Sequence, residues 1–155
     1  MGADLTSGRT HFWAVAWQIF LAHPLFGAGL DSFGVAFTKY DTWNGLLRVE
    51  RAHNDYLQIL AEGGLAGFAC IVGFIYLFFR KALATIWAAG EGLRRDAAIG
   101  STAGCVGILV HSFVDFPLRT WSNSFFFLLL VAIAIVRVAP ETSRVSQAHH
   151  RSTSR

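Results

Sequence analysis

Charged residues are scarce in this sequence. Asp, Glu, Lys and Arg make up 15% of its 155 residues and hydrophobic residues 54%, whereas a typical soluble domain carries about 25% charged residues. The formal net charge is only +3, and no basic stripe or RNA-binding motif occurs, so nucleic-acid binding is not expected. The length allows one domain at most. The composition therefore indicates an integral membrane protein.

Other features are also missing. The only two cysteines, Cys70 and Cys105, both fall inside apolar runs, so we expect packing roles and neither a disulfide nor a metal site. The N-terminus has no basic region followed by an apolar core, so we do not expect these residues to be a signal peptide. No Asp-x-Asp motif occurs, and nothing else points to a bound metal. We therefore expect no cofactor.

What the sequence does contain is three long uncharged runs, at residues 63–79, 97–114 and 120–136. Crossing a bilayer takes roughly 17–25 mostly apolar residues in a helix, and lipid offers no partner for open backbone groups. The sequence therefore predicts an all-α integral membrane fold with three transmembrane helices over residues 63–138. A polar tail, 139–155, has no apolar period and is expected to be disordered and cytoplasmic.

Basic residues near the ends of the runs predict the orientation. They are densest in the connection between the first two runs and in the tail: Arg80, Lys81, Arg94, Arg95, Arg137, Arg144, Arg151 and Arg155. These two segments lie on one side by alternation, so that side is expected to be cytoplasmic. Residues 1–62 are then a periplasmic segment that holds a short interfacial helix and a second helix.

Residues 10–30 are uncharged as well, and two interpretations stay open for them. His11 and Gln18 interrupt the run, and Pro24 with the glycines after it ends the helix early. The remainder, about residues 12–22, is too short to cross a bilayer, and its two tryptophans favour an interfacial helix. The alternative is a fourth span.

The segment 51–64 is the most informative stretch. His53 and Asn54 precede apolar residues at helical spacing, and Asp55 with Gln58 resembles a capping box. The pattern predicts that His53 lies at the start of a helix that runs into the first span. A histidine at the edge of the membrane can change protonation near neutral pH and act as a base. The alternative is that His53 caps the helix or hydrogen-bonds a carbonyl.

Several motifs occur in an order that resembles the O-antigen ligase and polymerase family. Arg9 stands four residues before Trp13, the loop 24–30 reads Pro-Leu-Phe-Gly-Ala-Gly-Leu, and Phe33 follows. The hallmark of that family is His, then Asn, Ser or Gln, nine free positions, Gly, two free positions, and Gly, Thr or Tyr. His53, Asn54, Gly64 and Gly67 satisfy it, and the run 111–119 also looks like a segment of the family.

The resemblance, which covers about residues 9–137, implies a glycosyltransferase of the bacterial inner membrane. Its implied partners are an undecaprenyl-diphosphate-linked glycan and a glycolipid or glycan acceptor on the periplasmic face. The hypothesis is that His53 accepts the acceptor's proton while Arg9 binds the diphosphate. Asn54 is expected to orient His53 or a sugar hydroxyl. Arg48 and Arg51 are candidates by proximity, with a solvated basic surface as the alternative.

Three further candidates for substrate binding lie in the run 111–119. His111 and Asp115 are four residues apart and share a helix face, and ionisable groups near a membrane are often functional. They either line the site or anchor the chain at the interface. Arg119 follows in the short turn before the last apolar run.

Family members usually have ten or more spans, so the chain is expected to be a C-terminal portion that works with a missing N-terminal half and is inactive alone. The motifs do not separate a ligase from a polymerase or from a protein glycosyltransferase. The rival interpretation is a non-catalytic membrane subunit or scaffold that has kept the fold.

Overall fold

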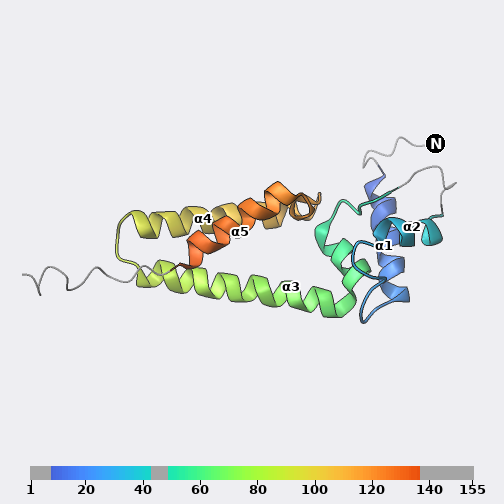
Figure 1. Cartoon of the computed structure of the whole chain (residues 1–155), viewed down its shortest axis with the longest axis horizontal. Coiled ribbons are helices and arrows are strands. Elements are labelled where there is room, and N and C mark those ends of the chain that lie inside the picture. The colour runs from blue at the N-terminus through green and yellow to red at the C-terminus, as the bar shows by residue number, and fades with distance from the viewer. Residues whose placement is uncertain (1–7, 43–48, 137–155) are drawn as a thin grey trace, which may run out of the picture.

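A computed structural model describes residues 8–42 and 49–136 of the chain. The regular elements of this part are all helices and it contains no strand, which confirms the predicted all-α class. Its elements are α1 (Arg9–Ala22), α2 (Phe33–Tyr40), α3 (Asp55–Ala88), α4 (Leu93–His111), the short 3-10 helix η1 (Pro117–Arg119) and α5 (Trp121–Ile135). Figure 1 shows α3, α4 and α5 running lengthwise beside one another, with α1 and α2 at the end where α3 begins.

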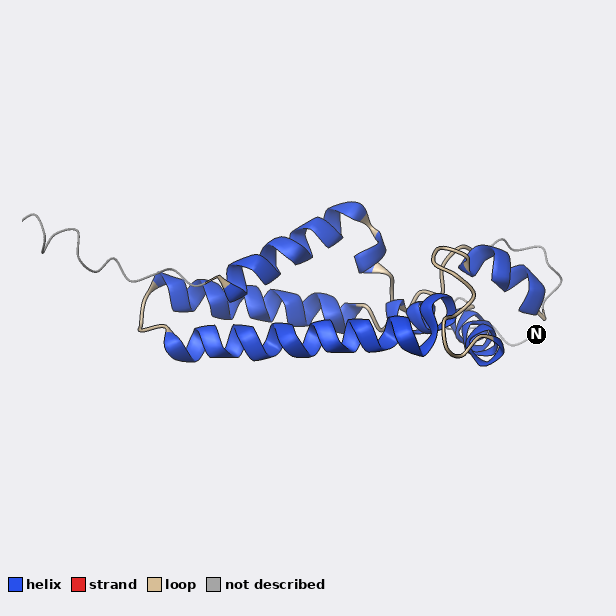
Figure 2. Ribbon diagram, turned by 60° about the horizontal axis from the view of Figure 1, so that its bottom comes forward, coloured by secondary structure: helices blue, strands red, loops and turns tan. Residues whose placement is uncertain are grey.

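Two separate apolar cores follow from this arrangement. The first joins α1 and α2 to the beginning of α3, and the second joins the rest of α3 to α4 and α5; Figure 2 shows the same division from another side. Cys105 is fully buried in the second core, whereas Cys70 is exposed. The site described below lies where the two cores meet.

Helix α3 is kinked at Gly64, whose backbone angles, φ 60° and ψ −159°, are not helical. The loop 24–29 hydrogen-bonds both sides of the kink through main-chain atoms. The amides of Ala28 and Gly29 donate to the carbonyls of residues 61 and 62, at 2.9 and 3.0 Å. The amides of residues 65 and 66 donate to the carbonyls of Pro24 and Leu25, at 2.8 and 3.1 Å. We call this contact the loop–kink joint; it satisfies backbone groups that a helix leaves open at a break.

The loop–kink joint requires glycine on both sides. A Cβ atom at Gly64 would lie 2.6 Å from the backbone of residues 25 and 27, and one at Gly27 would lie 2.2 Å from the backbone of Glu62. Both glycines also have positive φ, which residues with a Cβ rarely adopt. Gly64, which the family hallmark includes, therefore serves this close approach of two backbones.

The connection between the first two apolar runs, which was expected to be a loop from Arg80 to Arg95, is helical over most of its length, so that expectation was wrong. α3 continues past Arg80 and Lys81 to Ala88, and α4 already begins at Leu93. Ala82 and Thr85 are buried on this extension, and no helix-breaking residue occurs before Gly90. Packing thus carries the helix beyond the end of the apolar run.

Of the described helices, α3 alone is long and apolar enough to cross a bilayer; α5 is a shorter apolar helix of 15 residues. Only 22% of the most apolar window of α3 is buried, whereas the core helix of a soluble protein would be mostly covered. Helices α4 and α5 occupy the other two predicted runs, but their crossing of a membrane stays a prediction. The same holds for an interfacial position of α1, which ends at Ala22 where the short helix was expected to end.

Candidate functional site

His53 lies in the turn directly before α3, with a positive φ of 52°. Its ring stacks on Phe12 of α1 at a centroid distance of 6.1 Å and meets the edge of Phe116 at 4.9 Å. Nδ1 of His53 lies 3.3 Å from Oδ1 of Asp115, and 35% of the side chain is exposed. The two aromatic rings and the carboxylate contact the imidazole and restrict its position.

Asn54, and not His53, caps the helix. Its Oδ1 accepts hydrogen bonds from the amides of Tyr56 and Leu57, both at 3.0 Å, which is the pattern of an N-cap asparagine. Its Nδ2 donates to the carbonyl of Phe113 at 2.9 Å. The predicted capping box of Asp55 and Gln58 was wrong. The N-cap is one residue earlier, at Asn54, whose side chain reaches the second and third helical amides.

The start of α3 docks on the connection between α4 and α5, which brings His53 to Asp115. The amide of Asp55 donates to the carbonyl of Ser112 at 2.9 Å, and its buried carboxylate accepts from the amide of Leu118 at 3.2 Å. The hydroxyl of Tyr56 donates to the carbonyl of Leu109 at 2.8 Å. Residues about sixty positions apart in the sequence are thus held together by hydrogen bonds to backbone groups of the connection and of the end of α4.

Asp115 stands between two histidines. Besides the contact with His53, its Oδ2 lies 3.8 Å from Nε2 of His111. The predicted proximity of His111 and Asp115 is therefore present, although α4 ends at His111 and Asp115 belongs to the turn that follows. The second contact of Asp115, with His53, comes from a segment that the helical spacing could not reveal.

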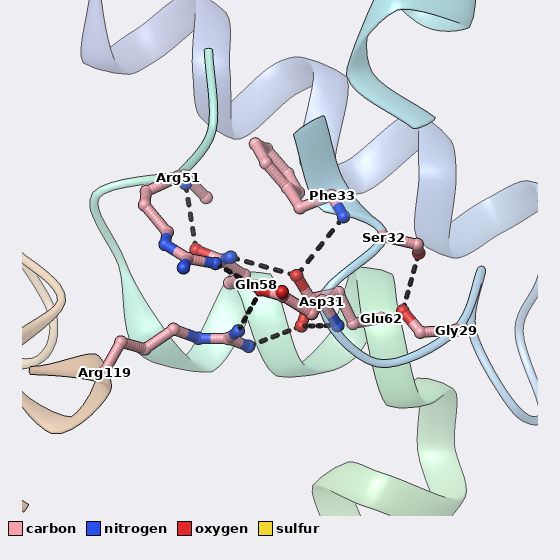
Figure 3. Close-up of polar contacts among 9 residues, drawn as sticks. Gly29, Asp31, Ser32, Phe33, Arg51, Gln58, Glu62 and Arg119 are labelled. Atoms are coloured by element: carbon pink, nitrogen blue, oxygen red, sulfur yellow. Dashed lines mark hydrogen bonds and ion pairs between the residues drawn. The ribbon is translucent and has the colours of Figure 1, made fainter. Parts of the chain in front are cut away.

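A second polar cluster lies beside this one, around the buried carboxylate of Glu62 (Figure 3). Nη2 of Arg119 lies 2.5 Å from Oε2 of Glu62, whose side chain is 1% exposed. Gln58 donates to Oε1 at 3.0 Å, and the backbone amides of Asp31 and Phe33 donate to the two oxygens at 3.2 and 3.3 Å. Four donors from three segments converge on one carboxylate, which compensates for its burial.

The sequence did not single out Glu62. Gln58 and Glu62 are four residues apart, so they share one helix face, and Glu62 is the last charged residue before the first apolar run. Two polar residues at helical spacing, next to the apolar Leu57 and Ala61, were the only sign in the sequence that Glu62 is buried. The burial of Glu62 depends on the approach of loop 24–33 and of Arg119, neither of which the spacing shows.

Arg51 completes the second cluster. Its Nη1 donates to Oδ1 of Asp31 at 2.8 Å, and Nη1 of Arg119 lies 4.0 Å from the same oxygen. The hydrogen bond and charge of Arg51 hold the pKa of the Asp31 carboxyl below its usual value, so the contact weakens only as the pH falls through that lowered pKa. Arg51 and Arg119, two predicted site residues, are therefore brought together.

A pocket of about 580 Å³ opens next to these arginines. Its polar lining residues are Asp31, Arg51, Asp55, Arg119 and Ser124, and its apolar lining residues are Ile59, Ile71, Leu118 and Trp121. A pocket lined by both guanidinium groups and hydrocarbon suits an anionic headgroup attached to an apolar chain.

The remaining two predicted arginines are placed differently. Arg9 is the first residue of α1 and is exposed. It stands three residues before Phe12, which stacks on His53, but none of the contacts among the described residues joins Arg9 to His53. Arg48 lies outside the described residues, as do Arg137 and the predicted disordered tail.

The geometry thus assembles a histidine–aspartate pair and an arginine pair around the start of a helix whose kink needs Gly64. Residues 1–72 match the O-antigen ligase family model. The match confirms the resemblance over just under half of the chain and contains His53, Arg9 and the loop–kink joint. No curated protein and no solved structure matches the chain.

The O-antigen ligase match supports a role of ligase or polymerase type in polysaccharide assembly at a membrane. His111, Asp115 and Arg119 lie beyond the matched residues. Asp115 contacts His53 and Arg119 contacts Glu62, which ties these two residues to the matched part, whereas His111 contacts Asp115.

Proposed function

We propose that the chain is the C-terminal portion of an O-antigen ligase-like glycosyltransferase. It would move a glycan from an undecaprenyl-diphosphate carrier to a hydroxyl acceptor on the periplasmic face. The observation that carries this proposal is the contact of His53 with Asp115, beside two arginines and an amphiphilic pocket, in a chain whose residues 1–72 match the family.

His53 is the proposed general base. The acceptor oxygen forms a bond to the anomeric carbon of the glycan, the bond from that carbon to the diphosphate oxygen breaks, and Nε2 of His53 takes the hydroxyl proton. Asp115 accepts from Nδ1–H, which fixes the ring orientation and stabilises the imidazolium that forms. The diphosphate leaves as a stable anion and needs no general acid.

The arginines are the proposed electrostatic part of the site. Planar guanidinium groups bind phosphate oxygens in pairs, and Arg51 and Arg119 both face the pocket. Arg9 is carried over from the family motif as a further diphosphate ligand. The reaction is proposed to be independent of metal, in keeping with the lack of Asp-x-Asp in the sequence. From the family resemblance, we also propose that further helices of the enzyme complete the cavity that holds the lipid carrier.

Replacing His53 with alanine tests the function. Loss of a positioned base is expected to slow transfer about 10²–10⁴-fold, so surface glycan should disappear from a gel when the variant replaces the gene at its native locus. Asp115→Asn should reduce transfer less, because the imidazole is retained. His23→Ala is the matched control, since His23 is an exposed histidine at the end of α1.

An unchanged glycan ladder in His53→Ala, at equal protein level, would remove the enzyme proposal. It would leave the non-catalytic subunit or scaffold as the better interpretation.

The proposed topology places α3, α4 and α5 across the inner membrane with residues 1–62 in the periplasm. In a background that lacks Cys70 and Cys105, Thr42→Cys should react with a thiol reagent that cannot cross the membrane, and Glu91→Cys should react only after lysis. Both positions are exposed, so access to the side of the membrane decides the result. The reverse pattern would overturn the orientation.

A further inference from the structure

The Asp31 carboxylate occupies the point on which two arginines converge. Its Oδ1 lies 2.8 Å from Nη1 of Arg51 and 4.0 Å from Nη1 of Arg119 (Figure 3). The side chain of Asp31 is 77% exposed, although those of the two arginines are only 33% and 18% exposed. An exposed anion therefore sits on two largely covered cations at the wall of the pocket.

The backbone of Asp31 is held independently of its carboxylate. Its φ of 61° is in the left-handed region, and its amide donates to Oε2 of Glu62 at 3.2 Å. The amide of Phe33, two residues on, donates to Oε1 of the same side chain. Within the described residues, the carboxylate itself contacts only the two arginines. It can leave them by side-chain rotation while the loop stays in place.

The two arginines are held unequally. Arg119 is fixed through Nη2 by the buried Glu62, so its Nη1 is presented toward Asp31. Among the contacts of the described residues, the Arg51 side chain is joined to the cluster through Asp31. If the Asp31 carboxylate moved aside, both guanidinium groups would present free N–H donors to the same place, and a phosphate has oxygens enough to accept from both.

We propose that Asp31 is a displaceable internal anion, and that the diphosphate of an amphiphilic ligand binds between Arg51 and Arg119 by taking the place of its carboxylate. The inference rests on the proposed function and names a gate within that site. Asp55 also lines the pocket, but its carboxylate is buried and accepts from the amide of Leu118. The same pocket is also lined by Ile59, Ile71, Leu118 and Trp121, which can contact the hydrocarbon part of such a ligand.

Calorimetry of inorganic pyrophosphate binding to the full chain in detergent tests whether the Asp31 carboxylate acts as this gate. Asp31→Asn removes the charge and keeps a residue that tolerates a positive φ. It should tighten pyrophosphate binding about fivefold, because a partly exposed competing ion pair is lost. Asp31→Gly, which also suits this backbone, should tighten binding to a similar extent, so the test does not depend on one variant folding well.

Arg51→Gln should weaken pyrophosphate binding about tenfold or more, since it removes a charged donor. Lys39→Gln is the matched control: it removes an exposed cation on α2 that contacts the Tyr40 ring and should leave binding unchanged. Farnesyl diphosphate and farnesol, the same lipid without the diphosphate, distinguish the two sources of the ligand. A lipid diphosphate is identified if farnesyl diphosphate binds more tightly than pyrophosphate and if Asp31→Asn does not change the binding of farnesol. Equal binding of the two diphosphates would identify a free phosphate compound.

Unchanged or weaker pyrophosphate binding in both Asp31 variants would overturn the gate, as would full binding in Arg51→Gln. These outcomes are separate from failure of the proposed function. Pyrophosphate binding involves no transfer, so His53→Ala should bind as the unaltered chain does. A glycan ladder independent of His53 would remove the function and leave the binding results to stand alone.

Discussion

Replacing Gly64 with alanine is expected to leave almost no folded protein. The new Cβ would lie 2.6 Å from the backbone of residues 25 and 27, and backbone cannot move aside as a flexible side chain can. The φ and ψ of Gly64 also fall in a region that is essentially restricted to glycine. Relief of both would break the four hydrogen bonds of the loop–kink joint. A loss of more than about 4 kcal/mol in the free energy of unfolding follows.

Gly63→Ala is the matched control for Gly64→Ala. A Cβ at Gly63 meets nothing within 4 Å, and alanine favours a helix over glycine by about 1 kcal/mol. Thermal unfolding of the two variants in detergent, followed by size-exclusion fluorescence, should show loss for Gly64→Ala and no loss for Gly63→Ala. Equal midpoints would mean that α3 does not depend on the kink.

Replacing Glu62 with alanine is the second change with a large expected effect. It would leave the Arg119 guanidinium, the Gln58 amide and two backbone amides without their acceptor in a buried setting. Removing one partner of a buried ion pair costs about 3–5 kcal/mol, since the other charge is left uncompensated. The thermal midpoint should fall sharply, and α3 should lose the contacts of Glu62 with loop 31–33 and with Arg119, while Asp55 still accepts from the amide of Leu118.

Glu62→Gln separates charge from shape. It keeps a side-chain oxygen as acceptor but does not neutralise Arg119, so its midpoint should lie between those of Glu62→Ala and the unaltered protein. Glu91→Ala removes an exposed carboxylate from the turn between α3 and α4 and should change nothing measurable. If Glu62→Ala unfolds at the same temperature as Glu91→Ala, the buried cluster contributes nothing to the fold.

Features that depend on nearby sequence could be predicted. The apolar runs located α1, α3, α4 and α5 but not α2, and the position of His53 before Leu57 and Ala61 located it at the start of α3. The spacing of His111 and Asp115 predicted their proximity, which the structure shows. In each case the contact or element depends on residues a few positions apart.

Features that depend on distant backbone could not be predicted in this way. The contact of Asp115 with His53 requires α4 to run back beside α3, so that the end of α4 comes near the start of α3. The burial of Glu62 requires loop 24–33 to approach the kink, and the conformation of Gly64 has no local signature beyond the glycine itself. The extension of α3 beyond Lys81 was missed because charged residues end an apolar run without ending a helix.

The loop–kink joint is made entirely of main-chain atoms, so the bend of α3 does not depend on which side chains the loop carries apart from its glycines. Leu25, Phe26 and Leu30 all lie on the outside of this loop and are largely exposed. Replacing these three side chains should therefore leave the bend of α3 unchanged, so their exposed apolar surface can serve contact with a neighbour while the main chain of the joint fixes the course of the helix.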